Sequence, residues 1–148
     1  MKKSNFKNTD KTSSGFLLWQ VTTLWQREIK SALEKVELSH SAFVILASLL
    51  WFKEKKQTVT QTTIIDHSKL DKMTVSKSLK TLQNNSLVQR SENKEDTRSK
   101  IIVLTKEGES LAKNAIKMVE EIDHKFFSPL ETSEKNQLNE LFLKLKDT

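Results

Sequence analysis

The chain has 148 residues, which is enough for one compact domain with an appended dimerisation element but too few for a two-domain enzyme. Its 25 Lys and Arg against 19 Asp and Glu give a net charge of +6, which suits a polyanionic partner. The absence of cysteine excludes disulfides, thiolate metal sites and a cysteine nucleophile, and it fits a reducing cytoplasm. The longest near-continuous apolar run, 42–52, is too short to span a bilayer, so we expect a soluble protein without a membrane partner.

The positive charge is concentrated in the middle of the chain. Residues 69–100 contain eight basic and four acidic residues, net +4, whereas residues 105–148 are net −2. The segment 1–14 has almost no apolar content, which predicts a disordered arm before a single domain over 15–148. The basic residues of this arm are Lys2, Lys3, Lys7 and Lys11.

The first third of the chain predicts two helices. Two Gly and one Pro in the whole sequence allow most of it to be helical. Apolar residues recur at spacings of three and four over 15–36, which predicts an amphipathic helix capped by Ser13 or Ser14. Residues 42–52 are apolar nearly all round, so we expect a buried central helix that Ser39 or His40 opens.

A helix, a turn and a second helix are expected next. Residues 58–59 predict one short strand, and Thr60 can cap a short helix that runs to about residue 68. A break follows at 69–70, after which Asp71 caps the second helix. The core stripe of this helix is Val75, Leu79 and Leu82, and its predicted left-handed stop is Asn84-Asn85.

The last part of the chain predicts a hairpin and two more helices. The β-prone pieces 87–88 and 101–103 flank a polar loop over 91–99, as in a two-stranded wing. Thr105 caps a long helix to about Phe127, ended before Pro129, and Ser133 caps the last one. The expected fold is mainly α (α+β) in the order ααβααββαα. It has a winged helix-turn-helix core over about 38–104 and an α-helical dimerisation region made by helices 15–36 and 105–146.

Three segments resemble the MarR family of bacterial regulators, and their order and spacing together are specific. Residues 64–77 resemble its two-helix DNA reader, 96–98 (Asp-Thr-Arg) its wing loop, and 104–108 (Leu-Thr-Lys-Glu-Gly) its strand-to-helix junction. Lys69 and Ser86 stand where the family commonly has glycine. The resemblance covers about 15–145. It implies a homodimeric transcription regulator, more often a repressor, that binds a pseudo-palindromic operator in double-stranded DNA.

The second helix of the reader carries the candidate base contacts. At about 100° per residue, the face opposite the core stripe holds Met73, Lys77 and Lys80, with small hydroxyls at its flanks. A major groove accepts such a face, because short polar side chains reach base edges while lysines meet phosphates. The competing explanation is an ordinary solvated surface helix. The predicted contacts are Lys72, Met73, Thr74, Ser76, Lys77, Lys80 and Thr81.

In the predicted wing, Arg98 is the residue expected to enter a minor groove, where a narrow A·T-rich track favours an inserted guanidinium. The resemblance supports a pairing in which Asp96 orients Arg98, whereas spacing alone leaves a surface ion pair as the alternative. The predicted wing contacts are Ser91, Lys94, Asp96, Arg98, Ser99 and Lys100.

Apolar residues beyond the reader suggest two further roles. Those at the two ends of the domain exceed what a thin lobe can bury alone, which predicts an obligate dimer. Relatives hold a small-molecule pocket near the first two helices, so aromatic residues there are candidates for binding an aromatic or lipophilic effector, although core packing is the more common role. The dimerisation residues are Leu17, Phe126, Phe127, Leu130, Leu138, Leu141, Phe142 and Leu145, and the pocket candidates are Trp19, Trp25, Phe43 and Trp51.

Other classes of function are disfavoured. His40, His67 and His124 lack partners at metal-ligand spacing, so we expect neither metal nor cofactor, although ligands gathered from separate helices would escape this test. There is no phosphate-binding glycine loop, paired carboxylates or nucleophile motif, which argues against an enzyme. The alternative from another class is a winged-helix module that binds protein, and such a module would not need eight basic residues across the reader and wing.

Overall fold

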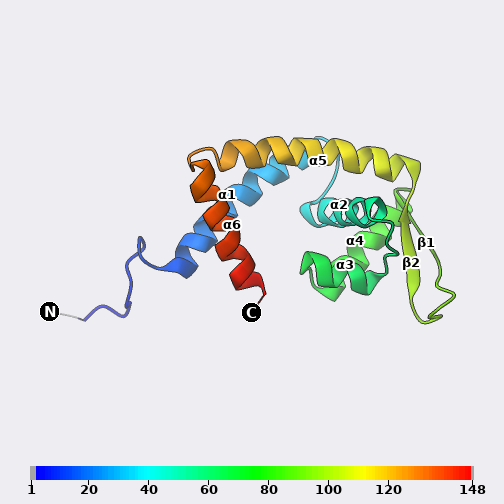
Figure 1. Cartoon of the computed structure of the whole chain (residues 1–148), viewed down its shortest axis with the longest axis horizontal. Helices are drawn as coiled ribbons and strands as arrows, with labels where there is room; N and C mark the ends of the chain where they lie inside the picture. Colours follow the sequence, from blue (N-terminus) through cyan, green and yellow to red (C-terminus); the bar gives the residue numbers. More distant parts are fainter. Residues whose placement is uncertain (1–2, 148) are drawn as a thin grey trace.

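The computed structural model describes residues 3–147, so Met1 and Lys2 of the predicted arm and Thr148 of the predicted domain lie outside the described residues. Within the described range the chain forms six helices and one two-stranded antiparallel sheet (Figure 1). The mainly helical fold with a small β wing is confirmed. In chain order the elements are α1 (Ser14–Glu34), α2 (His40–Glu54), α3 (Gln61–Ser68), α4 (Lys72–Asn84), β1 (Val88–Glu92), β2 (Lys100–Leu104), α5 (Lys106–Phe126) and α6 (Thr132–Lys146).

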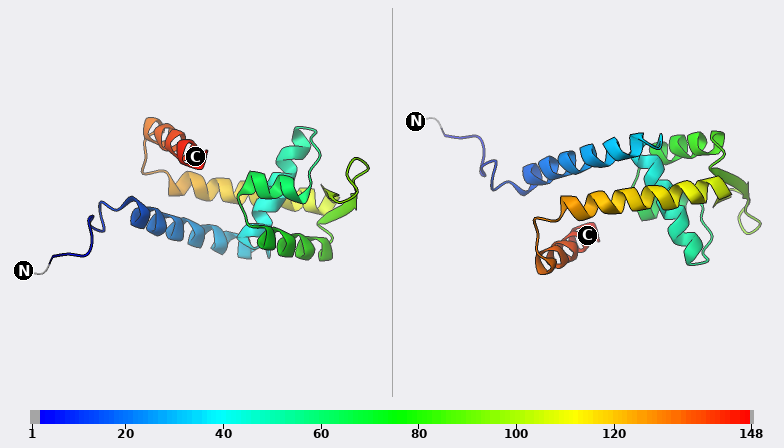
Figure 2. Two further views of the ribbon diagram at one scale, coloured as in Figure 1. Left: turned by 90° about the horizontal axis from the view of Figure 1, so that it is seen from below. Right: turned by 90° about the horizontal axis from the view of Figure 1, so that it is seen from above.

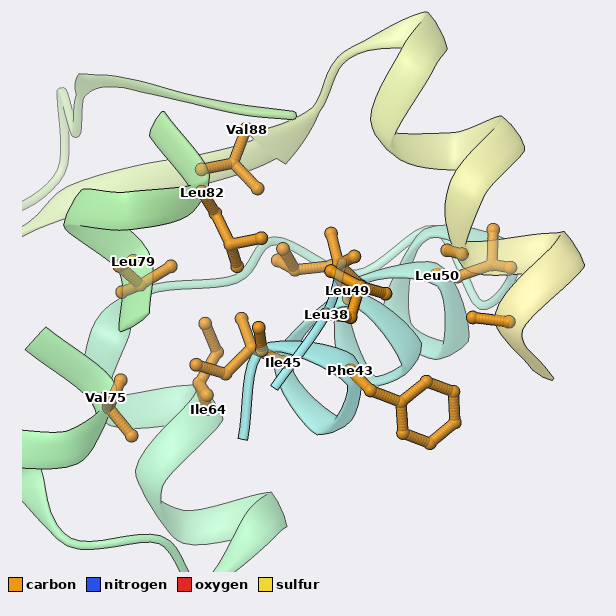
Figure 3. Close-up of a cluster of buried hydrophobic side chains, with 14 of the residues drawn as sticks. Leu38, Phe43, Ile45, Leu49, Leu50, Ile64, Val75, Leu79, Leu82 and Val88 are labelled. Carbon is orange, nitrogen blue, oxygen red and sulfur yellow. The ribbon is translucent and has the colours of Figure 1, made fainter. Parts of the chain in front are cut away.

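Helix α2 is the centre of the core, as its apolar sequence predicts. It packs against α1, α3, α4, α5 and β2. Its buried side chains include Phe43, Ile45 and Leu49, and Ile45 lies beside Ile64 of α3 while Phe43 points to the opposite side of the helix (Figure 3). A helix that is apolar on nearly all sides is stable in water only when neighbouring elements cover it all round.

The remaining elements divide into two regions around α2. The long helices α1 and α5 run side by side, and α6 turns away from the end of α5 (Figures 1 and 2). Helices α3 and α4 and the wing loop lie on the side of the molecule away from α5, and the N-terminal segment leaves α1 at the end far from the wing (Figure 1). Residues 3–13 form no helix or strand and contain one turn, closed by the Ser13 N–H, which donates to the Thr9 carbonyl at 3.0 Å.

Side-chain caps start most of the helices where the sequence predicts them. An oxygen of each capping residue accepts a backbone N–H from the first turn, which satisfies a donor that has no partner within the helix. The predicted cap of α6 at Ser133 is wrong. The Glu131 N–H donates to the Glu134 side chain at 2.9 Å, and this contact starts the helix two residues earlier. The confirmed caps are Ser13, Ser39, Thr60, Asp71 and Thr105.

The predicted strand at 58–59 is reduced to one bridge. Thr60 pairs with Ile101, and the Ile102 N–H donates to the Val59 carbonyl at 2.8 Å. The chain leaves α2 through Lys56, at φ 57°, and must already cap α3 at Thr60, so too few residues remain for a strand.

Both positions where the family commonly has glycine adopt the left-handed conformation. Lys69 has φ 64° and Ser86 has φ 60°. The predicted left-handed stop at Asn84-Asn85 is wrong, since Asn85 has φ −88° and Ser86 makes the reversal instead. The Leu87 N–H then donates to the Leu82 carbonyl at 2.9 Å, which closes the end of α4 and directs the chain into β1.

Gly108 allows the first turn of α5 to lie directly against the chain before β1. The Thr105 N–H donates to the Leu87 carbonyl at 3.1 Å, and the Thr105 hydroxyl donates to the Ser86 carbonyl at 2.7 Å. A Cβ at Gly108 would lie 1.9 Å from the Leu87 carbonyl oxygen. The Leu-Thr-Lys-Glu-Gly segment therefore fixes the base of the wing to α5.

We predict that Gly108→Ala destabilises the protein by about 1–3 kcal/mol, because backbone must move to admit the methyl group. Gly15, near the start of α1, is the matched control, since no atom lies within 4 Å of a Cβ placed there. Gly15→Ala should be neutral or stabilising by up to about 1 kcal/mol. Urea unfolding followed by circular dichroism measures both, and equal stability of the two variants would contradict the close approach.

Candidate nucleic-acid interface

Burial of one face of α4 turns the predicted DNA-contacting face outward. Val75, Leu79 and Leu82 are fully or almost fully buried. Met73 on the opposite side is 80% exposed, the most exposed large apolar residue after Phe6. The remaining predicted contacts of this helix are exposed, except Thr74, which is half-buried; the exposed set is Lys72, Ser76, Lys77, Lys80 and Thr81.

The hydroxyl groups of α4 differ in whether they already donate a hydrogen bond within the protein. The Thr74 hydroxyl donates to Asp71 at 2.8 Å, and the Thr81 hydroxyl donates to the Lys77 carbonyl at 3.2 Å. Ser76 instead accepts a hydrogen bond from the Gln61 Nε2 of α3 at 2.7 Å. Its own proton remains for donation, so Ser76 is the hydroxyl of this face best prepared to contact a ligand.

Asp71 anchors the start of α4. One carboxylate oxygen accepts the Thr74 N–H at 2.7 Å and the other accepts the Thr74 hydroxyl. The backbone hydrogen bond from Thr74, followed by the side-chain one, lowers the pKa of Asp71 below its usual value. The ionised carboxylate thus holds the first turn, on which Met73 and Thr74 lie.

The wing loop holds its turn with Asp96 and leaves Arg98 extended into solvent. Asp96 accepts the Arg98 N–H at 3.0 Å, while its contact with the Arg98 Nε is long, at 3.5 Å. The Asn93 amide donates to Ser99 at 3.1 Å and links the two sides of the loop. The Arg98 side chain is 92% exposed. Ser91, Lys94 and Lys100 are exposed beside it, and Ser99 is half-buried.

The sequence patterns did not predict two residues near this surface, Gln61 and Arg90. Gln61 was missed because its bond to Ser76 joins two helices. Arg90 pairs across the sheet with Ile102 and shares a strand face with the buried Val88. Its Nε is buried and has no hydrogen-bond partner within the described chain, which is costly for a charged donor. The period-two spacing from Val88 is the signal that marks Arg90 as facing inward.

The residues predicted for dimerisation are left partly or largely uncovered. None of the residues of α6 (Thr132–Lys146) is buried. Leu141, Phe142 and Leu145 of α6 are exposed, as are Leu17 and its neighbours on α1. The others, at the end of α5 and in the following turn and helix, are half-buried: Phe126, Phe127, Leu130 and Leu138.

The four aromatic candidates for an effector pocket do not line a common cavity in the described chain. Trp19 is 69% exposed and Trp51 is 50% exposed, whereas Phe43 is buried in the core. The Trp25 Nε1 donates to Asp123 at 2.8 Å, and the Trp25 ring lies 5.2 Å from the His40 ring. Burial lowers the pKa of His40, and the Asp123 charge opposes this shift in part.

Two further features were sought in residues 3–147: a metal site and a membrane-spanning helix. No group of three or more His, Asp or Glu side chains there is arranged to hold a metal ion. Nor does any helix in that range combine the length and apolar character needed to cross a membrane. His67 instead contacts Ser48 through Nδ1 at 3.1 Å and packs against Phe52.

A helix-turn-helix pair beside an antiparallel wing, with basic residues exposed on both, defines a winged-helix protein of the DNA-binding class. The winged-helix family described as "ArnR1-like, winged-helix domain" matches residues 34–122. YdcH of Bacillus subtilis, named an uncharacterized HTH-type transcriptional regulator, is 38% identical over 117 residues, which is 79% of this chain and 80% of YdcH.

Solved structures agree on the fold. BpsR of Bordetella bronchiseptica superimposes with a TM-score of 0.86 at 20% identity, over 97% of this chain and 99% of BpsR. A variant of MarR from E. coli in complex with operator DNA gives a TM-score of 0.77 at 20% identity, over 88% of this chain and 91% of MarR. The chain belongs to the ArnR1-like winged-helix family, is related to an HTH-type transcriptional regulator, and has the fold of MarR.

We predict that Asp71→Ala lowers the unfolding midpoint at pH 7, because the first turn of α4 loses its cap. Since the folded-state pKa of Asp71 is lowered, its stabilisation is complete above the unfolded pKa of about 3.9 and is lost as the pH falls through the folded value. The difference in midpoint between parent and variant should therefore shrink below about pH 4. A difference that persists unchanged down to pH 2 would contradict the ionic cap.

Proposed function

We propose that this regulator is a homodimeric, sequence-specific DNA-binding repressor whose affinity for its operator a small molecule alters, acting in the cytoplasm on the nucleoid. One observation carries the DNA-binding part of the proposal. The Arg98 side chain is 92% exposed in a wing loop that lies, with α3 and α4, on the side of the molecule away from α5 (Figure 1). An arginine held out in this way matches the geometry of minor-groove insertion.

The two elements have different tasks on a duplex. Helix α4 enters the major groove, where Ser76 and Met73 reach base edges and a thymine methyl group is a suitable partner for Met73. Lys72, Lys77 and Lys80 meet base edges or phosphates. Arg90 of β1 adds a positive charge near α4, since β1 and α4 are in contact.

In a homodimer, the α4 helices and wings of both copies would lie on one face of the assembly. The uncovered apolar residues of α1 and α6 support this, because an apolar surface of that extent favours association. A two-fold axis between the copies would present inverted half-sites about one helical turn apart, which makes the operator pseudo-palindromic.

The effector part of the proposal draws on aromatic side chains of α1 and α2. Trp25 and His40 are already in ring contact there, and Trp19 and Trp51 retain exposed surface for an aromatic or lipophilic molecule. In BpsR, DNA binding is regulated by 6-hydroxynicotinic acid.

Electrophoretic shift with DNA from upstream of the gene tests the function, and two variants separate the contacts. Arg98→Ala should weaken binding by about 1–3 kcal/mol and relax A·T preference at the flanks of the site. If Lys77 meets a phosphate, Lys77→Ala should weaken binding about equally on all sequences and lower the log-log salt slope by about one. If Lys77 reads guanine, preference at one central position should collapse instead.

Lys30→Ala is the matched control, since Lys30 is an exposed lysine of α1, outside both α4 and the wing. It should leave both affinity and salt slope unchanged. If Lys77→Ala and Arg98→Ala bind specific and random DNA as the parent does, with folding and dimerisation intact, a winged-helix module that binds protein becomes the better account. A repressor further requires that a reporter on the bound promoter rises when the gene is deleted.

We predict that the protein sediments as a dimer at micromolar concentration and that Phe142→Glu shifts it toward one chain, because a carboxylate would be buried in an apolar interface. Lys144→Glu alters the charge of the same helix at an exposed position and should leave the mass unchanged. Sedimentation equilibrium with parallel circular dichroism makes the measurement. A parent mass near one chain with full helicity would rule out the dimer.

A further inference from the structure

One side-chain hydrogen bond joins the two helices of the helix-turn-helix pair. The Gln61 Nε2 of α3 donates to the Ser76 Oγ of α4 at 2.7 Å, across 15 positions of the sequence. Among the described residues it is the only side-chain hydrogen bond between these two helices. Gln61 is half-buried and Ser76 is exposed, so the bond lies at the border of the face that we propose meets DNA.

The contacts of Thr60 hold Gln61 in place. Gln61 is the first residue of α3, and Thr60, which caps this helix, pairs with Ile101 of β2. The Thr60 N–H donates to the Thr63 hydroxyl at 3.1 Å, and the Thr63 N–H donates to the Thr60 hydroxyl at 3.3 Å. Because a capping box and a strand together fix this end of α3, the Gln61 amide is directed toward α4 by the fold.

The bond decides which hydrogen-bonding roles remain for Ser76. A hydroxyl has one donor and two acceptor positions, and the Gln61 amide occupies one of the acceptor positions. The Ser76 proton has no acceptor within the described chain, whereas the hydroxyls of Thr74 and Thr81 already donate to protein groups. Since an accepted hydrogen bond polarises the O–H group and strengthens it as a donor, Ser76 presents a donor to the ligand side.

A fixed donor selects among the bases in a major groove. Adenine and guanine both present the N7 acceptor there, whereas cytosine presents an amino donor. A serine hydroxyl that is free to rotate can donate or accept, so it discriminates poorly between these edges. A serine whose oxygen already accepts a bond should favour the purine edge.

We propose that Gln61 is a positioning residue, which sets the Ser76 hydroxyl as a donor to the N7 of a purine in the major groove. The inference rests on the proposed DNA-binding function and adds one base preference to it, purine over cytosine, at the position that Ser76 meets. Gln61 acts through Ser76 and contacts no base itself.

NMR of the free full-length protein tests the contact without DNA. The signals of the Gln61 side-chain NH2 group should move in Ser76→Ala, because the acceptor is lost. Ser78→Ala is the matched control, since the half-buried Ser78 also joins α4 to another helix, with its Oγ 3.0 Å from that of Ser41 in α2. Gln61 signals that move equally in both variants, or in neither, overturn the contact.

Purines replaced by their 7-deaza analogues, which lack the N7 acceptor, test the base reading. Fluorescence anisotropy on the duplex found by electrophoretic shift gives the Kd for each substituted position. In the parent, one purine of each half-site should show a rise in Kd of about three- to tenfold, the effect of losing one hydrogen bond. Ser76→Ala should bind more weakly and show no such rise.

Two variants of Gln61 separate positioning from simple support of the fold. Gln61→Met keeps the length of the side chain without its donor and should reduce the 7-deaza rise to less than about twofold. Gln61→Glu accepts the Ser76 proton, so it should abolish the rise and also weaken binding to all sequences through repulsion from phosphates. Ser78→Ala should keep the full rise. Circular dichroism checks that each variant is folded.

The outcomes are distinct. A 7-deaza rise of the same size in the parent and in Gln61→Met overturns the positioning role. A parent that is insensitive at every purine, but loses affinity when a methylphosphonate replaces one phosphate and does so only while Ser76 is present, overturns base reading in favour of a phosphate contact. A parent that binds no DNA overturns the proposed function and the base preference with it, and the NMR result on the free protein then concerns the Gln61–Ser76 contact alone.

Discussion

The burial of Val75, Leu79 and Leu82 decides which face of α4 meets solvent. Each of these side chains contributes about 1.5–3 kcal/mol when it is removed from water, so the stripe opposes any rotation of the helix about its axis. Their partners are the buried residues of α2 and Ile64 of α3 (Figure 3). Because the stripe points inward, Met73, Ser76 and Lys77 must point outward, so the face that we propose reads DNA is a consequence of how the core packs.

The wing depends on a second constraint, the close approach of α5 to the chain before β1. Ser86 reverses the chain in the left-handed conformation, and Gly108 leaves room for the Leu87 carbonyl. The bonds of Thr105 to Ser86 and Leu87 then fix the strand ends. Arg98, at the far end of the hairpin, is placed by these contacts at its base and by the turn that Asp96 holds.

Local patterns predicted the parts of this fold that local chemistry determines. The caps Thr60, Asp71 and Thr105 and the stripe of α4 follow from side-chain type and helical spacing. Strand propensity on both sides of a polar loop predicted the wing, and the family resemblance supports the pairing of Asp96 with Arg98, which spacing alone leaves open. Predictions failed where a distant or competing contact decides the outcome. Ser86 rather than Asn85 adopts the left-handed conformation after α4, because the next residues must enter the sheet. Helix α6 starts before the predicted cap Ser133, because the Glu131 N–H donates to the Glu134 side chain. Nothing in sequence spacing brings Trp25 to Asp123, 98 residues away.

The central claim is that α4 and the wing read double-stranded DNA as a symmetric pair. Selection of bound sites from random duplex DNA by the full-length protein, followed by sequencing, tests it most directly. The account predicts enrichment of one site made of two inverted half-sites with centres about one helical turn apart, with an A·T preference at its flanks. A selected pool with the composition of the starting library would contradict it.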